Sequence, residues 1–479
     1  MLFNSIDFAI FLPLVFGLYW LVGSNLKLQN IGVLFASYLF YAWWDWRFLS
    51  LIIFSTVVDF SIAIMLSKQE SPFKRKTLLW ISIVVNLGLL GFFKYYNFFL
   101  EEFLAAFSFF GSDIKTNSLN IILPVGISFY TFQTLSYTID VYKKKLVPTN
   151  SLIDFSAFVS FFPQLVAGPI ERAINLLPQF YVKRKFDYNK AVDGMRQVLW
   201  GLFKKIVIAD NCAEYVNLIF SNSSDYTGST LLIAAIFFAF QIYGDFSGYS
   251  DIAIGVSRLF GFELMQNFAF PYFSRDIAEF WRRWHISLST WFRDYLYIPL
   301  GGSRGSTWGK IKNTFIIFIV SGFWHGANWT YIAWGVLNAI YFTPLLLLEK
   351  NRNNIEIVAF GKKILSIREF FKITRTFTLT VIAWIFFRAE SVNHAIKYIS
   401  TIFSSSLFTF PEGKPINLLF LVLLIIFCTL IEWEGREFKY ALGNFSNKKK
   451  GFCWTMYLVI ATMIYLSPEQ EVDFIYFQF

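Results

Sequence analysis

Charged residues and cysteines are scarce in this sequence. Of its 479 residues, 15% are charged and three are cysteines. Soluble domains carry about 25% charged residues, so an ordinary water-soluble domain is excluded. Three cysteines without a paired spacing argue against both a disulfide framework and a cysteine-based metal site. The three histidines also lack the spacing of a helical zinc site. We therefore expect neither a bound metal nor a bound cofactor.

Long apolar runs, by contrast, are abundant in this chain. Hydrophobic residues make up 56% of it and aromatic residues 21%. A bilayer core about 30 Å thick needs about 20 apolar residues per helix, which leaves room for roughly 11–14 spanning or re-entrant helices. Runs such as "LLFLVLLIIFCTLI" (418–431) lack the alternation of a membrane barrel. The sequence predicts an all-α polytopic membrane protein. Because no Gly-, Pro- or Ser-rich linker interrupts it, we expect a single membrane domain over residues 1–479.

The net charge of +10 is spread over short loops between the apolar runs. An excess of Lys and Arg in such loops marks the cytoplasmic side of a membrane and favours contact with anionic lipid headgroups. A nucleic-acid-binding protein would need one continuous basic face, so we expect no nucleic-acid partner. The basic clusters are residues 73–76, 142–146, 182–185, 309–312, 361–363 and 447–450.

His325 lies within residues 313–348, a segment without any Asp, Glu, Lys or Arg. As one helix this segment would be about 54 Å long, too long for a single crossing. The Gly and Asn of "HGAN" (325–328) predict a break there. Since basic residues flank both ends, we expect a re-entrant hairpin with His325 near its tip. An ionisable side chain at that depth is a functional candidate, although it can also simply bond a neighbouring helix.

A second histidine lies in "SRDIAEFWRRWHISLSTWFRDYLYIPLGG" (274–302). The pattern predicts one amphipathic helix whose apolar stripe contains His285. This helix would lie in the membrane interface or line a pocket between spans. The third histidine, His394, is close to the end of an apolar segment, and we assign it no role.

Two carboxylates occupy the apolar run "QIYGDFSGYSDIAIG" (241–255). We expect Gly244 and Gly248 to loosen the helix there. Buried Asp245 and Asp251 would need partners. They could orient a histidine, take part in proton transfer or cap broken helix ends, and capping is favoured.

These motifs together resemble a known family. "FWRRWHISLSTWFRDYLYIPLGG" followed by "GFWHGANWTYIAWG" is similar to the signature of the membrane-bound O-acyltransferases. The resemblance runs from end to end and is strongest to the bacterial branch that includes the alginate O-acetylation membrane protein. "FFPQLVAGPIER", "YGDFSGYSDIAIG" and "WIFFRAES" also resemble that branch.

The resemblance implies a ring of helices around a thin core, with a funnel on either side, and transfer of an acyl group from a thioester to a hydroxyl. His325 takes the place of the active-site histidine, for which we expect the role of general base. His285 takes the second polar position, where it would orient the reactants or polarise the carbonyl. Asn338 stands where many relatives have another histidine. The supporting residues expected are Asp245, Tyr249, Asp251, Trp324, Asn328 and Asn338.

The chain ends in an acidic segment and then "FIYFQF". The charge pattern predicts that residues 467–479 form an extracytoplasmic tail. The aromatic end is either an interfacial anchor or a segment tucked into the outer funnel. By the resemblance, Tyr476 is a candidate acyl carrier that would hold the acyl group as an ester.

We therefore expect a multi-pass O-acetyltransferase of the bacterial cytoplasmic (inner) membrane. Acetyl-CoA would be the donor substrate and an extracytoplasmic polysaccharide the acceptor, with an exported acyltransferase partner completing the transfer. One alternative is D-alanyl transfer to teichoic acid. A different class of alternative is a transporter or polysaccharide-export component.

Overall fold

A computed structural model describes the chain except for residues 24, 110–118, 120, 167, 413–414 and 468–479. The described residues form helices and no β-strand, which confirms the all-α prediction. Within this described part of the chain, six helical segments are long and apolar enough to cross a membrane. The count of 11–14 helices and the ring with two funnels stay predictions. The six segments are Leu26–Lys68, Pro72–Ser108, Gly228–Leu259, Trp329–Leu347, Ile367–Arg388 and Leu418–Gly435.

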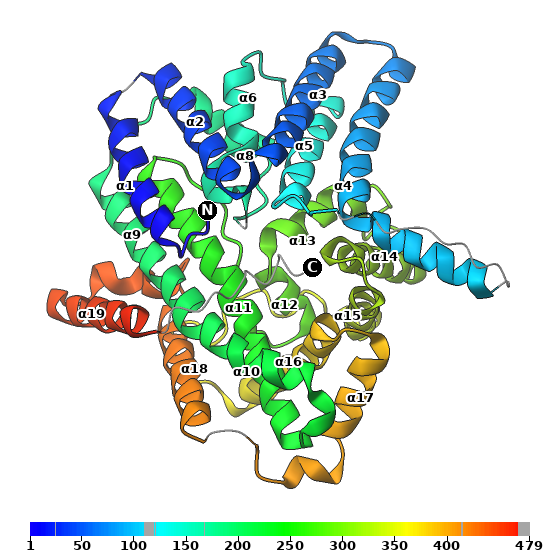
Figure 1. Ribbon diagram of the computed structural model, residues 1–479, viewed down its shortest axis with the longest axis vertical. Coiled ribbons are helices and arrows are strands. Elements are labelled where there is room, and N and C mark those ends of the chain that lie inside the picture. Colours follow the sequence, from blue (N-terminus) through cyan, green and yellow to red (C-terminus); the bar gives the residue numbers. More distant parts are fainter. Residues whose placement is uncertain (24, 110–118, 120, 167, 413–414, 468–479) are drawn as a thin grey trace. The chain divides into compact units, whose positions relative to one another are not determined.

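The described residues pack into two compact units, residues 1–191 with 256–264, and residues 192–255 with 265–479. In the first unit, three long helices lie side by side (Figure 1). Polar side chains join them. The Asp59 carboxylate of α3 accepts hydrogen bonds from Asn86 of α4 (2.8 Å) and Thr138 of α5 (3.1 Å). Its main helices are α1 (Ile6–Leu21), α2 (Leu26–Asp45), α3 (Leu49–Lys68), α4 (Pro72–Phe109), α5 (Ile127–Tyr142) and α6 (Leu152–Val159).

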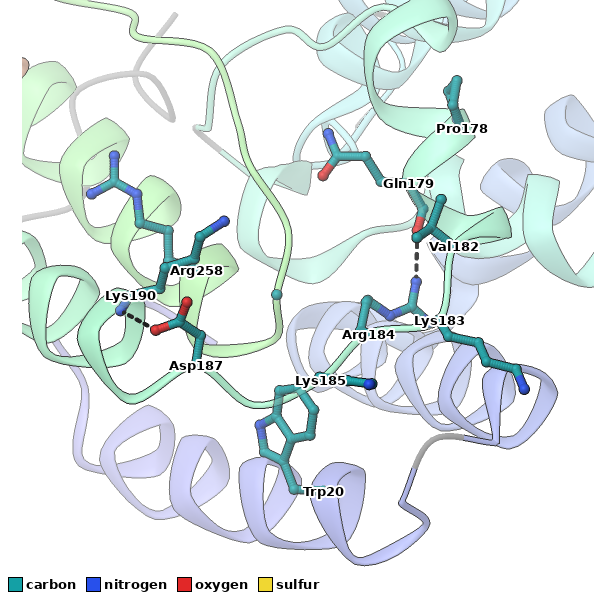
Figure 2. A pocket seen from close by; sticks show the side chains of 11 residues that line it. Trp20, Pro178, Gln179, Val182, Lys183, Arg184, Lys185, Asp187, Lys190 and Arg258 are labelled. Atoms are coloured by element: carbon teal, nitrogen blue, oxygen red, sulfur yellow. Dashed lines mark hydrogen bonds between the residues drawn. The ribbon is translucent and has the colours of Figure 1, made fainter.

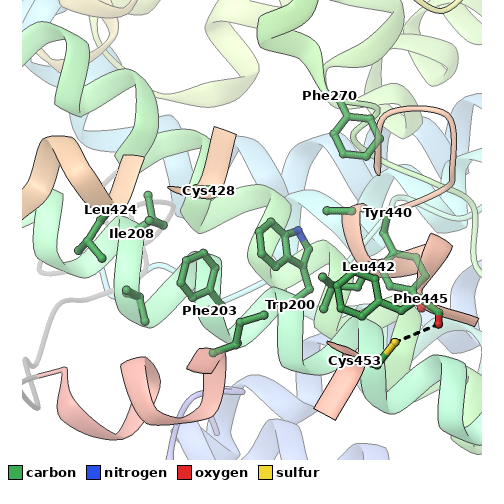
Figure 3. Packing of buried hydrophobic residues seen from close by; sticks show 13 residues of the cluster. Trp200, Phe203, Ile208, Phe270, Leu424, Cys428, Tyr440, Leu442, Phe445 and Cys453 are labelled. Atoms are coloured by element: carbon green, nitrogen blue, oxygen red, sulfur yellow. Dashed lines mark hydrogen bonds between the residues drawn. The ribbon is translucent and has the colours of Figure 1, made fainter. Parts of the chain in front are cut away.

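The second unit contains an apolar cluster in which distant segments meet (Figure 3). Trp200 of α9 stacks on Phe203 at 5.0 Å, and both pack with Leu424, Cys428 and Cys453. All three cysteines of the chain are buried and free, in agreement with the expectation of no disulfide framework. The helices around the cluster are α9 (Tyr188–Leu202), the π-helical segment η3 (Phe203–Ala209), α18 (Pro415–Gly435) and α19 (Lys450–Leu466).

Helix α11 (Gly228–Leu259) runs unbroken through the segment that we expected to be loosened, so that prediction is wrong. Its glycines instead allow backbones to approach closely, as small residues do between membrane helices. A Cβ on Gly248 would lie 2.8 Å from the carbonyl oxygen of Gly201, and one on Gly244 would lie 2.8 Å from that of Lys204.

Candidate active site

The predicted break is confirmed, and the two helices around it pack as a hairpin, whereas its re-entrant placement in a membrane stays a prediction. Helix α14 (Thr307–His325) ends at His325, and α15 (Trp329–Leu347) returns after three residues (Figure 1). The two legs pack so closely that a Cβ on Gly322 would lie 2.2 Å from the Tyr331 carbonyl oxygen. Asn328 caps α15, because its Oδ1 accepts the backbone N–H of Thr330 at 2.9 Å. The hairpin therefore places His325 at its tip.

His325 lies in an aromatic box and is 6% exposed. Its ring centroid is 5.0 Å from that of Trp324, 5.3 Å from Trp334 and 5.2 Å from Phe387 of α16 (Ile367–Arg388). Trp334 stacks in turn on Trp384 of α16 at 5.8 Å. The box thus holds the imidazole between one leg of the hairpin and a neighbouring helix.

The helix expected around His285 is broken at that residue, so the prediction of one amphipathic helix is wrong. Helix α12 (Ile277–Arg283) ends before it and α13 (Ile286–Phe292) begins after it, while His285 itself has φ 44° and ψ 55°. This left-handed conformation is uncommon for residues other than glycine and tends to occur at functional sites. A neighbouring loop supports it. The Ala269 N–H donates to the Arg283 carbonyl at 2.9 Å, and the Ile286 N–H donates to the Asn267 carbonyl at 2.8 Å.

The imidazole of His285 is buried, with Nδ1 3.4 Å from the Ser287 hydroxyl. That hydroxyl donates to Asn267 Oδ1 at 2.8 Å. Among the described residues, His285 Nε2 has no hydrogen-bond partner. Burial lowers the pKa of His285 to about 3, so the ring stays neutral at physiological pH. Its centroid lies 6.4 Å from the ring of Trp324, the residue next to His325. The two predicted histidines are therefore brought together through Trp324.

Asn338 lies behind the aromatic box. Its Oδ1 accepts the indole N–H of Trp281 at 3.3 Å, and its Nδ2 donates to the Trp334 carbonyl at 2.9 Å. Asn338 thus joins α12 to the hairpin leg that carries Trp334. Trp281 belongs to the apolar stripe predicted around His285, whereas Trp334 and Trp384 lie in the quoted family motifs without a predicted role.

Asp245 and Asp251 do not cap broken helix ends, so the favoured interpretation of them is wrong. Lys205 Nζ lies 2.7 Å from both Asp245 and Asp210. Lys204 Nζ lies 2.6 Å from Asp251. Both lysines belong to η3, and the ring of Tyr249 lies 5.8 Å from Lys205 Nζ. The carboxylates therefore join α11 to η3. The two lysines were not predicted as partners, because they lie inside the apolar stretch of residues 201–209.

Helix α11 also contacts His285, because the ring centroid of Phe246 lies 6.2 Å from that of His285. Tyr476 and the rest of the tail beyond residue 467 lie outside the described residues, so the prediction for them is untested.

A cavity of about 260 Å³ lies beside the hairpin. Trp281 and Phe318 line it with apolar surface, and Arg293 and Arg352 contribute positive charge. Ser321, which lies one helical turn before His325 on α14, also lines it. Trp281 is in ring contact with Trp334 at 5.6 Å, so one wall of the cavity is also the back of the aromatic box. The site thus offers a buried imidazole in an aromatic box and, behind that box, a mostly apolar cavity with cationic groups.

Comparison with known proteins supports the resemblance. Residues 143–387 match the family described as "MBOAT, membrane-bound O-acyltransferase family". The "Probable alginate O-acetylase AlgI" of Pseudomonas putida is 37% identical over 100% of both chains. The protein of the same name from Pseudomonas aeruginosa is 41% identical over 87% of this chain and 78% of that protein. The "Peptidoglycan O-acetyltransferase" of Helicobacter pylori is 34% identical over 83% of this chain and 79% of that protein.

The matched region spans both histidines, the hairpin and the aromatic box. Together with the long apolar helices, it favours an enzyme over the transporter that the sequence had left open. The chain therefore belongs to the membrane-bound O-acyltransferase family and is a multi-pass membrane O-acyltransferase.

Proposed function

We propose that this enzyme moves acetyl groups from acetyl-CoA on the cytoplasmic side to hydroxyls of an extracytoplasmic polysaccharide. The observation that carries the proposal is His325, buried in an aromatic box at the tip of a hairpin and linked through Trp324 to a second buried histidine. The acceptor class comes from the relatives, whose names specify alginate and peptidoglycan. We place the enzyme in a bacterial cytoplasmic membrane, because its named relatives come from bacteria and its family is membrane-bound.

The cavity beside the hairpin supports a thioester donor. A pantetheine arm is long and slim, and the apolar walls at Trp281 and Phe318 suit it. The charged residues Arg293 and Arg352 suit the phosphates of the nucleotide end of coenzyme A. The basic residues at both ends of the hairpin favour a cytoplasmic opening.

His325 acts as the general base in this proposal. An apolar setting favours the neutral form of an imidazole, which can accept the proton of a hydroxyl. As the hydroxyl oxygen attacks the acetyl carbonyl, the C–S bond breaks and the proton passes from His325 to the departing thiolate. The products are an acetyl ester and free coenzyme A. General-base work of this kind contributes about 10²–10⁴-fold, and holding thioester and hydroxyl together supplies much of the rest.

In the first step, we propose that the Tyr476 hydroxyl accepts the acetyl group. Its acetyl ester would carry the group to the outer side, where an exported partner enzyme passes it to the polymer. His285, whose buried Nε2 is unpaired among the described residues, would orient the reactants or polarise the carbonyl. The motifs at the chain end and the family resemblance support this division of roles.

Purified enzyme incubated with acetyl-CoA labelled on the acetyl group tests the proposal. We expect label on the protein that is released by mild base, as an ester requires. Label that appears only with a D-alanyl carrier protein would favour teichoic acid as the acceptor pathway. Purified protein that takes up no label from either donor, while its unfolding temperature shows it to be intact, would contradict the donor assignment.

Matched variants distinguish the proposed roles of His325 and Tyr476. His325→Gln should lower labelling by at least 100-fold, in line with the loss of a general base of about 10²–10⁴-fold. His394→Gln is the control, because this histidine is not part of the aromatic box. Its Nε2 lies 2.9 Å from the Ser223 hydroxyl. Tyr476→Phe should abolish the base-labile label, whereas Tyr465→Phe, at an exposed tyrosine, should leave it unchanged. Unchanged labelling in Tyr476→Phe would sink the carrier role.

A further inference from the structure

A separate cavity of about 400 Å³ lies within the first unit, beside the end of α1 (Figure 2). Five cationic side chains and one carboxylate, Asp187, line it. The cations come from two distant parts of the chain, namely the loop between η2 (Leu177–Tyr181) and α9 with the start of α9, and the end of α11. They are Lys183, Arg184, Lys185, Lys190 and Arg258.

Arg184 is built into the wall of this cavity and is 5% exposed. Its Nη1 donates to the Gln179 carbonyl at 3.0 Å, and its Nη2 donates to Asn30 Oδ1. Its Cζ lies 4.5 Å over the ring of Phe262. The buried Nε has no hydrogen-bond partner among the described residues. A fixed guanidinium with an unsatisfied donor favours an anion nearby.

The two lysines on either side of Arg184 are available for such an anion. Lys183 and Lys185 are both exposed, and neither forms an ion pair within the described part of the chain. By contrast, Lys190 is held by Glu263 at 3.0 Å. Burial lowers the pKa of Arg184, and an anion in the cavity would counter this effect by favouring the charged form.

Helix α1, whose end borders the cavity at Trp20, also carries exposed apolar side chains. Leu14, Leu18 and Leu21 of α1 are each more than 60% exposed, one or nearly one helical turn apart. Trp20 lines the cavity, and its ring contacts that of Phe186 at 5.5 Å. Its indole N–H donates to the Leu259 carbonyl at 3.1 Å, which fixes the end of α1. Tryptophan and basic residues gather where helices meet the headgroup layer.

We propose that this cavity binds the phosphodiester headgroup of an anionic phospholipid from the cytoplasmic leaflet. Lys183, Lys185 and Arg184 surround the phosphate, and the acyl chains lie along the exposed leucines of α1. Basic pockets at the cytoplasmic ends of membrane helices bind such headgroups. The coenzyme A phosphates carry similar chemistry, but coenzyme A would make no use of the exposed leucines of α1. The site is independent of the proposed acetyl transfer.

The test compares purified protein in micelles with added phosphatidylglycerol or phosphatidylcholine. Bound lipid is counted by native mass spectrometry, and unfolding is followed by a thiol-reactive dye, because all three cysteines are buried. The test variant is Lys183→Gln/Lys185→Gln. The control is Lys74→Gln/Lys76→Gln, which removes two exposed charges from the basic cluster at the start of α4. Neither readout depends on catalysis.

We expect phosphatidylglycerol to bind the wild type and the control alike and to raise their unfolding temperatures more than phosphatidylcholine does. Near an anionic lipid surface each lysine contributes about fivefold in affinity, so the test variant should bind phosphatidylglycerol about 25-fold more weakly. Equal binding to both variants would overturn the proposal. It would also fail if the test variant lost stabilisation by coenzyme A while keeping that by phosphatidylglycerol, because the cavity would then hold the donor phosphates.

Discussion

Replacing Lys205 with methionine should destabilise the protein strongly. Lys205 is fully buried, and its Nζ is 2.7 Å from one carboxylate oxygen of Asp210 and from one of Asp245. Methionine preserves much of the side-chain volume but leaves two buried carboxylates without their shared cation. Removing one partner of a buried ion pair costs about 3–5 kcal/mol. We expect this loss from the free energy of unfolding, and a fall of roughly 5 °C or more in unfolding temperature.

The measurement is thermal unfolding in detergent, monitored by the reaction of a dye with the buried cysteines. Lys448→Met is the matched control, because that lysine forms an exposed pair with Glu434 at 3.9 Å. Such surface pairs are worth about 0–1 kcal/mol, so the control should unfold close to the wild-type temperature. The triple variant Lys205→Met/Asp210→Asn/Asp245→Asn removes all three charges and should recover part of the loss. A Lys205→Met protein as stable as wild type, or a triple variant no better than the single one, would refute the reasoning.

Two further predictions concern the candidate site. Gly322→Ala places a methyl group 2.2 Å from the Tyr331 carbonyl oxygen and should lower the free energy of unfolding by about 1–3 kcal/mol or more. Gly17→Ala, which has no heavy atom within 4 Å of the added methyl group, should leave stability unchanged. Equal unfolding temperatures of the two variants would contradict the close packing of the hairpin. Burial lowers the pKa of His285 from 6.5 to about 3, so between these values the unfolded chain binds more protons than the folded one and stability falls as pH falls. This effect should lower the free energy of unfolding by about 2 kcal/mol between pH 7 and pH 5. The unfolding temperature should therefore fall less between these pH values in His285→Asn than in the wild type. Identical falls would count against a buried neutral histidine.

The hairpin could be predicted because its signals are local. A charge-free segment too long for one crossing, with Gly and Asn near its middle, requires a break close to Gly326. The same kind of reasoning failed at His285, because nothing in its neighbourhood resembles a helix-breaking sequence. There the break is supported by hydrogen bonds to Asn267 and Ala269, which come from a loop that local periodicity does not include.

The carboxylates of α11 show the same limit. Their need for partners could be inferred from burial alone, since a charge in an apolar run must be compensated. Which partners they have depends on how η3 packs against α11, and that packing is set by Gly201, Gly244 and Gly248. Glycine in a helix indicates flexibility when it is taken in isolation. Its role here becomes visible only when the opposing backbone is known.

The length of α14 fixes the direction in which His325 points. Each residue added to a helix turns the residues after it by about 100° and advances them by about 1.5 Å. One extra alanine between Thr307 and Gly322 would therefore swing the imidazole out of contact with Trp334 and Phe387, even though every residue of the signature remained. An insertion of about seven residues, close to two full turns, would restore the angle but shift the ring by about 10 Å. The length of α14 thus sets both the position and the direction of the His325 ring. The enzyme should therefore tolerate substitutions in this leg far better than changes in its length.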